Sequence, residues 1–184
     1  TLFRSVNASQ AEYLPRTPYD ECVEWICNLL DEAAASLPAI RTNKEDYGLA
    51  TSVGAKAVKA KMLLYAASPL FNGNSAFYSN FADKSGNMLM PVTYDPNKWV
   101  KARTAIKEAI DLAEQNGHAL YTKQDYKIGN EDANPYPAAG PVRCLRTSLV
   151  DWDSRNPEVL LAETRSEGSY GIQNKSLPFV TDGW

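Results

Sequence analysis

The sequence predicts a mainly α-helical fold in which tetratricopeptide-like helix-turn-helix pairs carry long irregular loop insertions. Three segments of roughly 17 to 20 residues have apolar residues at helical spacing and begin or end at recognisable helix signals. Two other stretches are rich in Asn, Ser, Gly, Pro and aromatic residues, which is typical of loops. A strict period of about 34 residues is absent, because the stretch 69–94 separates the second helix from the third. Any repeat is therefore degenerate.

The first predicted helix begins at Thr17 and Pro18 and ends at Pro38. Thr17 is expected to cap it, and Pro18 suits the first helical position, where no backbone N–H is needed. Asp20 and Glu21 in the first turn complement the positive end of the helix dipole. The residues expected on its apolar side are Val23, Ile26, Cys27, Leu30, Ala34 and Leu37.

The second predicted helix begins at Thr51 or Ser52 and ends at Ser68. Three lysines of its first half are expected to face water: Lys56, Lys59 and Lys61. The run Met62–Ala67 is apolar on all sides, so we expect other elements to enclose that half of the helix.

The pair Ser68-Pro69 is expected to stop this helix so that the chain can leave the helical stack. Phe71 is then expected to fold back as a plug, while residues 72–74, Asn-Gly-Asn, turn the backbone. A structural stop is favoured here over a ligand site.

The third predicted helix starts at Asp95 and Pro96, again a cap followed by proline, and stops at Asn116 and Gly117. Its apolar stripe consists of Trp99, Ala102, Ile106, Ala109, Ile110 and Ala113. Trp99, and Trp25 in the first helix, are both expected to be packing residues.

The remaining sequence is expected to be irregular over residues 69–94 and 129–157, the latter with four prolines. The apolar run Glu158–Thr164 fits a strand or a helix, and periodicity does not decide between them. We predict one domain over residues 1–184. Its helical repeat part would cover about 17–120 and a loop-rich, ligand-side part about 121–184.

Composition excludes some function classes. The net charge is −3 and no Lys/Arg cluster is present, which argues against nucleic acid as a partner. The apolar runs fall far short of the roughly 18 residues that a membrane-spanning helix needs. Cys22 and Cys27 are poorly aligned for a disulfide, and Cys144 lies alone in a loop-like region, so all three are expected to be buried free thiols. No spacing indicates zinc, and neither metal nor cofactor is expected.

The sequence contains little acid–base chemistry. Its one histidine, His118, follows Gly117 and is expected at a helix end or on the surface. Asp151 and Asp153 could place two carboxylates about 6–7 Å apart on an extended segment, an arrangement of interest for a glycosidase. A solvated turn is the favoured interpretation, so we expect no catalysis. A glycan-degrading enzyme using these two aspartates stays an alternative.

Many aromatic residues fall outside the helical stripes, and sugar binding needs exposed aromatic faces beside polar side chains. Trp152 ranks first because charged residues flank it, and Tyr136 second because prolines hold it on both sides. The candidate ligand-binding residues are Trp152, Tyr136, Asp153, Arg155, Asn134 and Tyr78. The competing interpretation for each aromatic residue is that it pins a loop to the core.

Four phrases in order along the chain are distinctive: "LDEAAASLP" (30–38), "YGLATSVGAKAVKAKMLLYAASPLFNGN" (47–74), "WVKARTAIKEAIDLAEQNGHALY" (99–121) and "NPEVLLAETR" (156–165). Together they resemble the SusD/RagB family, outer-membrane nutrient-binding lipoproteins of Bacteroidetes. One departure is that Gly48-Leu49 stands where the family usually has Gly-Arg before Ala-Thr. Family members are several hundred residues long, so the resemblance implies an internal fragment whose lipid anchor lies outside this chain.

The resemblance implies that the protein binds a nutrient at the cell surface without catalysis. The ligand would be a polysaccharide or oligosaccharide, or in some members a peptide. It would be delivered to a SusC-like TonB-dependent transporter in the outer membrane, and the insertion 74–94 would cover the ligand or face that transporter. A helical-repeat scaffold for protein partners is the second alternative, which predicts a regular period and few loop aromatics.

Overall fold

The computed structural model describes residues 16–123, 139–148 and 156–162. Its helical elements in chain order are α2 (Tyr19–Ser36), the 3-10 turn η1 (Lys44–Asp46), α3 (Ser52–Ala67), α4 (Ser75–Tyr78), α5 (Asn97–Gln115) and α6 (Pro141–Ser148). These described ranges contain no strand, only an isolated antiparallel bridge between Ala82 and Met88. The predicted mainly α-helical class is confirmed.

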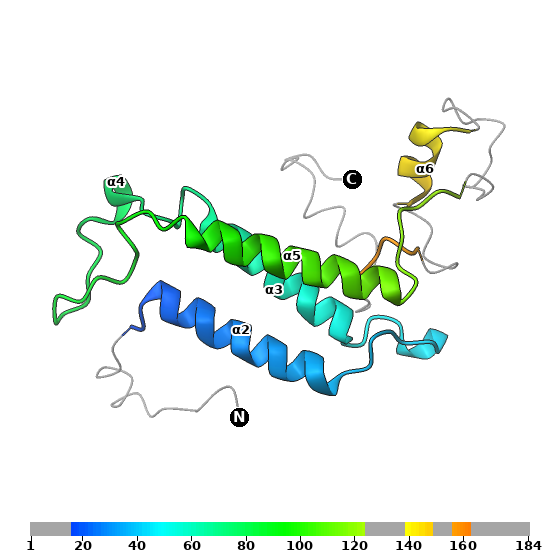
Figure 1. The fold of residues 1–184 in the computed structure, drawn as a ribbon, viewed down its shortest axis with the longest axis horizontal. Helices are drawn as coiled ribbons and strands as arrows, with labels where there is room; N and C mark the ends of the chain where they lie inside the picture. Colours follow the sequence, from blue (N-terminus) through cyan, green and yellow to red (C-terminus); the bar gives the residue numbers. More distant parts are fainter. Residues whose placement is uncertain (1–15, 124–138, 149–155, 163–184) are drawn as a thin grey trace, which may run out of the picture.

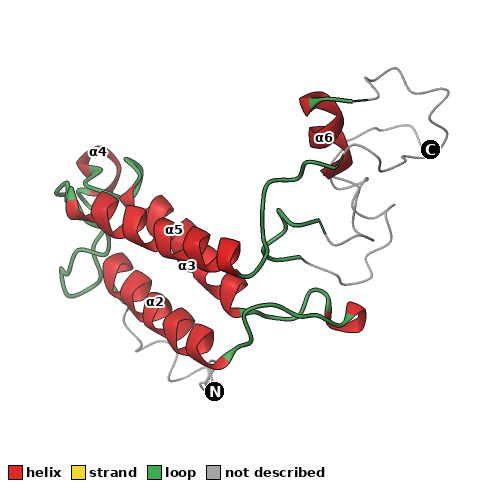
Figure 2. Ribbon diagram, turned by 45° about the vertical axis from the view of Figure 1, so that its right-hand side comes forward, coloured by secondary structure: helices red, strands yellow, loops and turns green. Residues whose placement is uncertain are grey.

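The three long helices form one layered group (Figure 1). α3 runs antiparallel to both α2 and α5 and packs against each of them, whereas α2 and α5 make no such contact with one another. α2 and α5 therefore run parallel, with their first turns at the same end of the group (Figure 1). α6 stands apart from these helices, as Figure 2 shows.

The seam between α3 and α5 is built from alanine. Ala60, Ala105 and Ala109 form its buried cluster, and Leu63 and Ile106 pack against them. Small side chains let two helix backbones approach closely, which places larger residues of the stripe at the edges of the seam. The expected packing role of Trp99 is accordingly wrong, since 41% of this residue is exposed.

Two further expectations about enclosed side chains are also wrong. Trp25 on α2 is 55% exposed. The run Met62–Ala67 is not enclosed on all sides, because Leu64 and Tyr65 are 40% and 55% exposed. Among the helices that the structure describes, only α2 and α5 pack on α3, so one side of α3 has no helix against it.

The seam between α2 and α3 contains a group of charges. Lys56 and Lys59 of α3 were expected to face water, but their amines contact the Asp31 carboxylate of α2 at 2.7 and 2.5 Å. Burial acts to raise the pKa of Asp31, but the hydrogen bonds from both lysines outweigh it and leave that pKa below its ordinary value. The hydrogen bond to Asp31 likewise raises the pKa of Lys56. The helical pattern placed these lysines on the polar side without showing that α2 supplies their partner.

The variant Asp31→Asn should lower the free energy of unfolding by about 1 kcal/mol at pH 7, because two lysines lose their shared counter-charge in a partly exposed site. A lowered pKa in the folded state means that the stabilisation is present above the ordinary aspartate pKa of about 3.9. It is lost as pH falls through the pKa of the folded protein. Urea unfolding at a series of pH values between 7 and 3 measures this effect. The free energy of unfolding should fall less steeply with decreasing pH in the variant than in the native protein.

The matched control for this test is Asp111→Asn, which removes an exposed pair with Lys107 one turn away on the same helix. We expect a change of only about 0.3–0.5 kcal/mol from it. Two results would contradict the stabilising role of Asp31. One is an equal loss of unfolding free energy in both variants, and the other is a pH dependence of that free energy that Asp31→Asn leaves unchanged.

The helix ends follow local rules. Thr51 caps α3, its hydroxyl accepting a hydrogen bond from the Gly54 N–H at 3.0 Å. After the last residue of α5, Gln115, Gly117 has φ +86 and the His118 N–H donates to the Ala113 carbonyl at 3.0 Å, which is the Schellman arrangement. His118 thus lies at a helix end, as expected, and its Nδ1 lies 2.9 Å from the Pro157 carbonyl oxygen.

The helix starts were predicted within one or two residues. Pro96 has helical backbone angles (φ −65, ψ −21), and the Asp95 carboxylate accepts a hydrogen bond from the Asn97 N–H at 2.9 Å, as expected of a cap. At α2 the expected cap Thr17 is wrong. Pro18 occupies the N-cap position with extended angles (φ −54, ψ 145) and makes no side-chain cap bond.

The later segments depart more from expectation. Residues 141–148 form α6 inside a stretch that was expected to be irregular, so Cys144 lies on a helix rather than in a loop. All three cysteines are free, but only Cys27 is buried, with Cys22 and Cys144 half-buried. Residues 158–162 of the ambiguous apolar run are neither strand nor helix.

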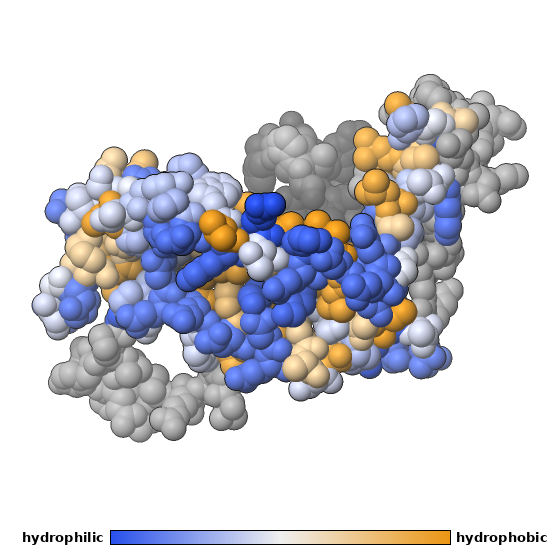
Figure 3. Space-filling view, viewed as in Figure 1, coloured by the Kyte–Doolittle hydropathy of each residue, from blue (hydrophilic) through white to orange (hydrophobic). Residues whose placement is uncertain are grey.

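Figure 3 shows hydrophilic residues over most of the long helices and hydrophobic residues near α6, where Val142 and Leu145 are exposed.

Candidate functional site

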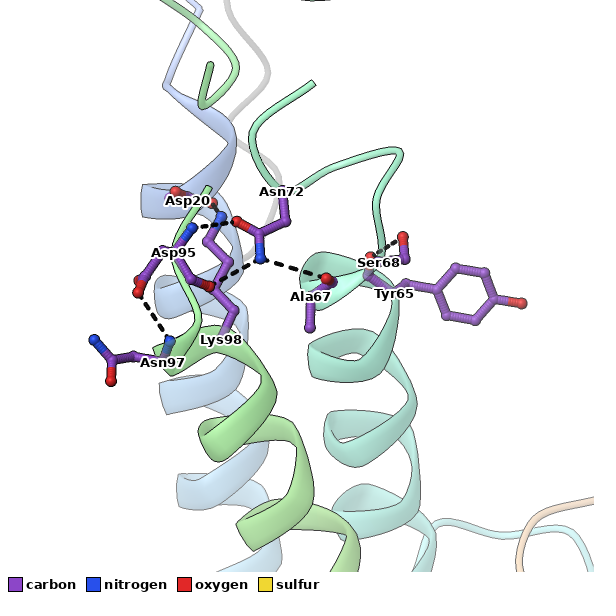
Figure 4. A network of polar contacts seen from close by, with 8 residues as sticks. All are labelled: Asp20, Tyr65, Ala67, Ser68, Asn72, Asp95, Asn97 and Lys98. Carbon is purple, nitrogen blue, oxygen red and sulfur yellow. Dashed lines mark hydrogen bonds and ion pairs between the residues drawn. The ribbon is translucent and has the colours of Figure 1, made fainter. Parts of the chain in front are cut away.

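The insertion between α3 and α5 starts and returns at one buried side chain, Asn72, which is 3% exposed. Its amide nitrogen donates to the Ala67 carbonyl at 3.4 Å and the Asp95 carbonyl at 2.9 Å. Its amide oxygen accepts from the Asp95 N–H at 2.9 Å. Figure 4 shows this side chain lying between the end of α3 and the start of α5. Asn72 was expected only to turn the backbone, so its role as a bridge between two helices was missed.

The helix stop itself is as expected. Ser68 is the C-cap of α3, and its hydroxyl donates to the Tyr65 carbonyl at 2.6 Å. Gly73 follows with φ +80, and a Cβ there would lie 2.4 Å from the Tyr94 backbone nitrogen. The outgoing and returning chains therefore touch at their backbones, which only glycine permits.

A cluster of aromatic rings lies on the insertion. Tyr78 closes the short helix α4, with ring-centroid distances of 6.4 Å to Phe77 and 6.3 Å to Phe81. Both pairs are tilted, at 49° and 51°, which is a favourable aromatic geometry. Phe77 is 75% exposed and Phe81 41% exposed, while Tyr78 is half-buried. The Arg16 guanidinium lies 6.0 Å from the Phe81 ring centroid, at the limit of a cation–π contact.

A second aromatic pair supports the base of the insertion. Phe71 folds back and stacks on Tyr19 of α2, with centroids 5.3 Å apart and planes within 13°, so the expected plug is present. The Tyr19 N–H also donates to the Leu89 carbonyl at 2.8 Å. Burial raises the pKa of the Tyr19 phenol, with further contributions from Asp20 and Tyr78. The first turn of α2 and the insertion thus hold one another.

The tip of the insertion is a tight loop around Asp83. One carboxylate oxygen accepts hydrogen bonds from the Ser85 and Asn87 N–H groups, each at 2.8 Å. The other accepts from the Asn87 side chain at 3.0 Å. These hydrogen bonds, that of the Asn87 side chain first, hold the pKa of Asp83 below its ordinary value. The loop is thereby closed by its own backbone, and across the ranges that the structure describes no group of three His, Cys, Asp or Glu could hold a metal ion.

The structure places one of the six predicted ligand-binding residues, Tyr78, within this aromatic cluster. The other five lie outside the described residues: Trp152, Tyr136, Asp153, Arg155 and Asn134. Asp151, of the alternative catalytic pair, lies outside them as well. Phe77 and Phe81 belong with Tyr78, and the sequence signal for them was their i−1 and i+3 spacing from it.

Comparisons with known proteins give a partial likeness. Neither a family model nor a curated protein matches the chain. Among solved structures, the chain is similar to BT4246 of Bacteroides thetaiotaomicron, with 45% identity and a TM-score of 0.60 over 67% of this chain and 22% of that one. A selenomethionine form of BT4246 aligns with 47% identity and a TM-score of 0.56 over 63% of this chain and 20% of its own. This chain thus spans about a fifth of the length of the structures it matches.

None of the helices in the described ranges combines the length and apolar character needed to cross a bilayer.

Proposed function

We propose that this chain acts in nutrient capture of the SusD/RagB type. It would bind a ligand, a glycan in the first instance, at the cell surface and deliver it to a TonB-dependent transporter in the outer membrane. Two observations support the proposal. The phrases of the sequence resemble that family, and the chain is 45% identical to BT4246 over 67% of its length.

The observation that carries the choice of site is the exposed aromatic cluster of Phe77, Tyr78 and Phe81. Apolar ring faces with polar neighbours are what a pyranose requires, because its C–H face packs on an aromatic ring while its hydroxyls bond to polar groups. The insertion is also held at a fixed place by Asn72 and by Tyr19. A surface fixed in this way loses little conformational entropy when a ligand binds.

We further propose that the protein binds without catalysis. In the described ranges the one histidine, His118, follows the last turn of α5 and lies against the Pro157 carbonyl, far from the aromatic cluster in sequence. The partner transporter, the location on the outer membrane and a lipid anchor outside this chain are parts of the same proposal. They rest on the resemblance and not on a contact seen in this structure.

Titration calorimetry against a panel of oligosaccharides tests the proposal. We expect saturable binding without product formation, and binding about tenfold or more weaker in Phe77→Ala and Tyr78→Ala, a loss of about 1.4 kcal/mol. Trp25→Ala is the matched control, because Trp25 is an exposed aromatic residue on α2 and should leave affinity unchanged. Trp152→Ala and Tyr136→Ala are measured in parallel, since both stay predicted ligand contacts.

The outcomes separate the alternatives. Product formation that depends on Asp151 or Asp153 would replace the capture proposal with an enzyme. Binding that Phe77→Ala and Tyr78→Ala retain, but Trp152→Ala loses, would keep the capture function and move the site into the later segment. No binding to any member of a broad panel of glycans and peptide digests would contradict the capture proposal.

A further inference from the structure

The charged side chains of the insertion differ in how much hydrogen bonding they can offer a ligand. Residues 68–94 contain only two of them, Asp83 and Lys84, just after Phe81 of the aromatic cluster. Both carboxylate oxygens of Asp83 already accept hydrogen bonds within the loop. Lys84 is exposed and has no ion-pair partner within the described ranges. The charges of the insertion therefore cancel, while its amine stays available to a ligand and its carboxylate is largely occupied.

A further positive charge reaches the aromatic cluster from outside the insertion. The exposed guanidinium of Arg16 lies 6.0 Å from the Phe81 ring centroid, and no carboxylate of the described residues forms an ion pair with it.

The acids in the first turn of α2 are engaged or placed elsewhere. Asp20 contacts the Lys98 amine at 2.6 Å, a pair drawn in Figure 4, and Glu21 lines a hollow between α2 and α5. The cluster consequently has two cations and one occupied carboxylate beside it, although the whole chain has a net charge of −3. An anionic group on a ligand is thus attracted to this place and repelled by the charge of the chain as a whole.

We propose that the glycan bound at the aromatic cluster carries carboxylate groups, as the uronic acids do. This inference rests on the proposed function, because it names the chemical class of the ligand for the same site. A sugar packed on an exposed ring of the cluster brings its substituents close to the Arg16 guanidinium. A planar guanidinium can donate two parallel hydrogen bonds to one carboxylate, a match that a single hydroxyl group does not offer. A neutral glycan leaves this charge without a partner.

Calorimetric titration of the 184-residue protein with matched oligosaccharides tests the inference. Oligomers of galacturonate, mannuronate and glucuronate are each compared with the neutral oligomer of galactose, mannose or glucose. At an ionic strength of about 0.01 M we expect at least one acidic oligomer to bind about fivefold or more tightly than its neutral counterpart. Methyl esterification of its carboxylates should remove this advantage, and an ionic strength of about 0.15 M should reduce it.

Variants of one residue show whether Arg16 causes the preference. Arg16→Gln should abolish the advantage of the acidic oligomer and leave the affinity for the neutral oligomer unchanged, whereas a merely structural role would change both. Arg16→Lys should retain part of the advantage, because it keeps the charge but loses the planar pair of donors. The matched control is Arg103→Gln, which removes an exposed arginine of α5 and should leave both affinities unchanged.

The possible results separate this inference from the proposed function. If neutral oligomers bind and no acidic oligomer binds more tightly than its counterpart, the inference is wrong and the capture function stands. The same holds if the advantage of the acidic oligomer survives methyl esterification or survives Arg16→Gln. Absence of binding by all six oligomers and by the wider panel would contradict the capture function itself, and the inference with it.

Discussion

Replacing Gly73 with alanine should lower the free energy of unfolding by about 3 kcal/mol or more. Two costs combine at this position. The backbone has φ +80, which residues with a Cβ rarely adopt, and the new Cβ would meet the Tyr94 nitrogen at 2.4 Å and Tyr94 Cα at 2.6 Å. Both are backbone atoms, so no side-chain rotation relieves the clash. One of the two chain segments has to move, and their meeting point anchors the whole insertion.

Urea unfolding followed by circular dichroism measures this effect, and Gly86→Ala separates the two costs. Gly86 has a similar φ of +87, but a Cβ there would have no atom within 4 Å. We expect it to cost only about 1 kcal/mol, the conformational part alone. If both variants lose the same stability, the close approach of Gly73 to Tyr94 contributes nothing to the anchoring of the insertion.

The variant Asn72→Asp should cost about 3 kcal/mol at pH 7, although the two side chains have nearly the same shape. A carboxylate can still accept from the Asp95 N–H, but it cannot donate to the Ala67 and Asp95 carbonyls. It would also place a negative charge beside those carbonyl oxygens, in a position that is 3% exposed.

The pH dependence identifies the cause. Burial and the two carbonyls favour the neutral form, so the pKa of the new carboxyl is raised in the folded state. The deficit of the variant relative to the native protein should therefore be small below the ordinary aspartate pKa of about 3.9 and should grow as pH rises toward 7. Asn97→Asp is the control, since its exposed acid near the start of α5 should be neutral or slightly stabilising. A deficit in Asn72→Asp that is constant with pH would contradict this explanation.

The sequence predicts the helices well because their signals are local. Thr51 caps its own helix three residues away, and Gly117 ends α5 through bonds to the preceding turn. Neither requires knowledge of the rest of the chain. Thr17 fails as a cap for an equally local reason, since the extended angles of Pro18 delay the start of α2 by one residue.

Features that depend on a neighbouring helix could not be predicted from the sequence. Lys56 and Lys59 lie on the polar side of α3, and only the position of Asp31 on α2 converts that side into a seam. Trp99 has the spacing of a core residue, but the alanine seam leaves it at an edge. Asn72 has the composition of a turn, and its bridging role depends on Asp95, which comes 23 positions later.

In the candidate site, too, the residue type could be predicted from the sequence but its surroundings could not. Tyr78 was chosen as an aromatic residue outside any stripe, and the structure adds its neighbours Phe77 and Phe81 on the short helix α4 and just after it. The sequence did not indicate that the rings of this segment point outward. The predicted contacts centred on Trp152 and Tyr136 lie outside the described residues and stay predictions.

The hydrogen bonds of Asn72, which join the end of α3 to Asp95, affect how such a protein can diversify. One side chain bonds to the last residue of α3 and to Asp95 shortly before α5, so the entry and exit of the insertion are held together whatever lies between them. Doubling the length of a closed loop costs only about 0.6 kcal/mol of entropy. Leu89 and Met90 are buried and Leu89 accepts a hydrogen bond from Tyr19, so they belong to the constant part. The rest of the chain between Gly73 and Tyr94 can gain, lose or exchange residues over evolutionary time while the helices beneath keep their packing. The insertion is in this sense an interchangeable module on a constant frame, and new recognition properties can arise there without a new fold.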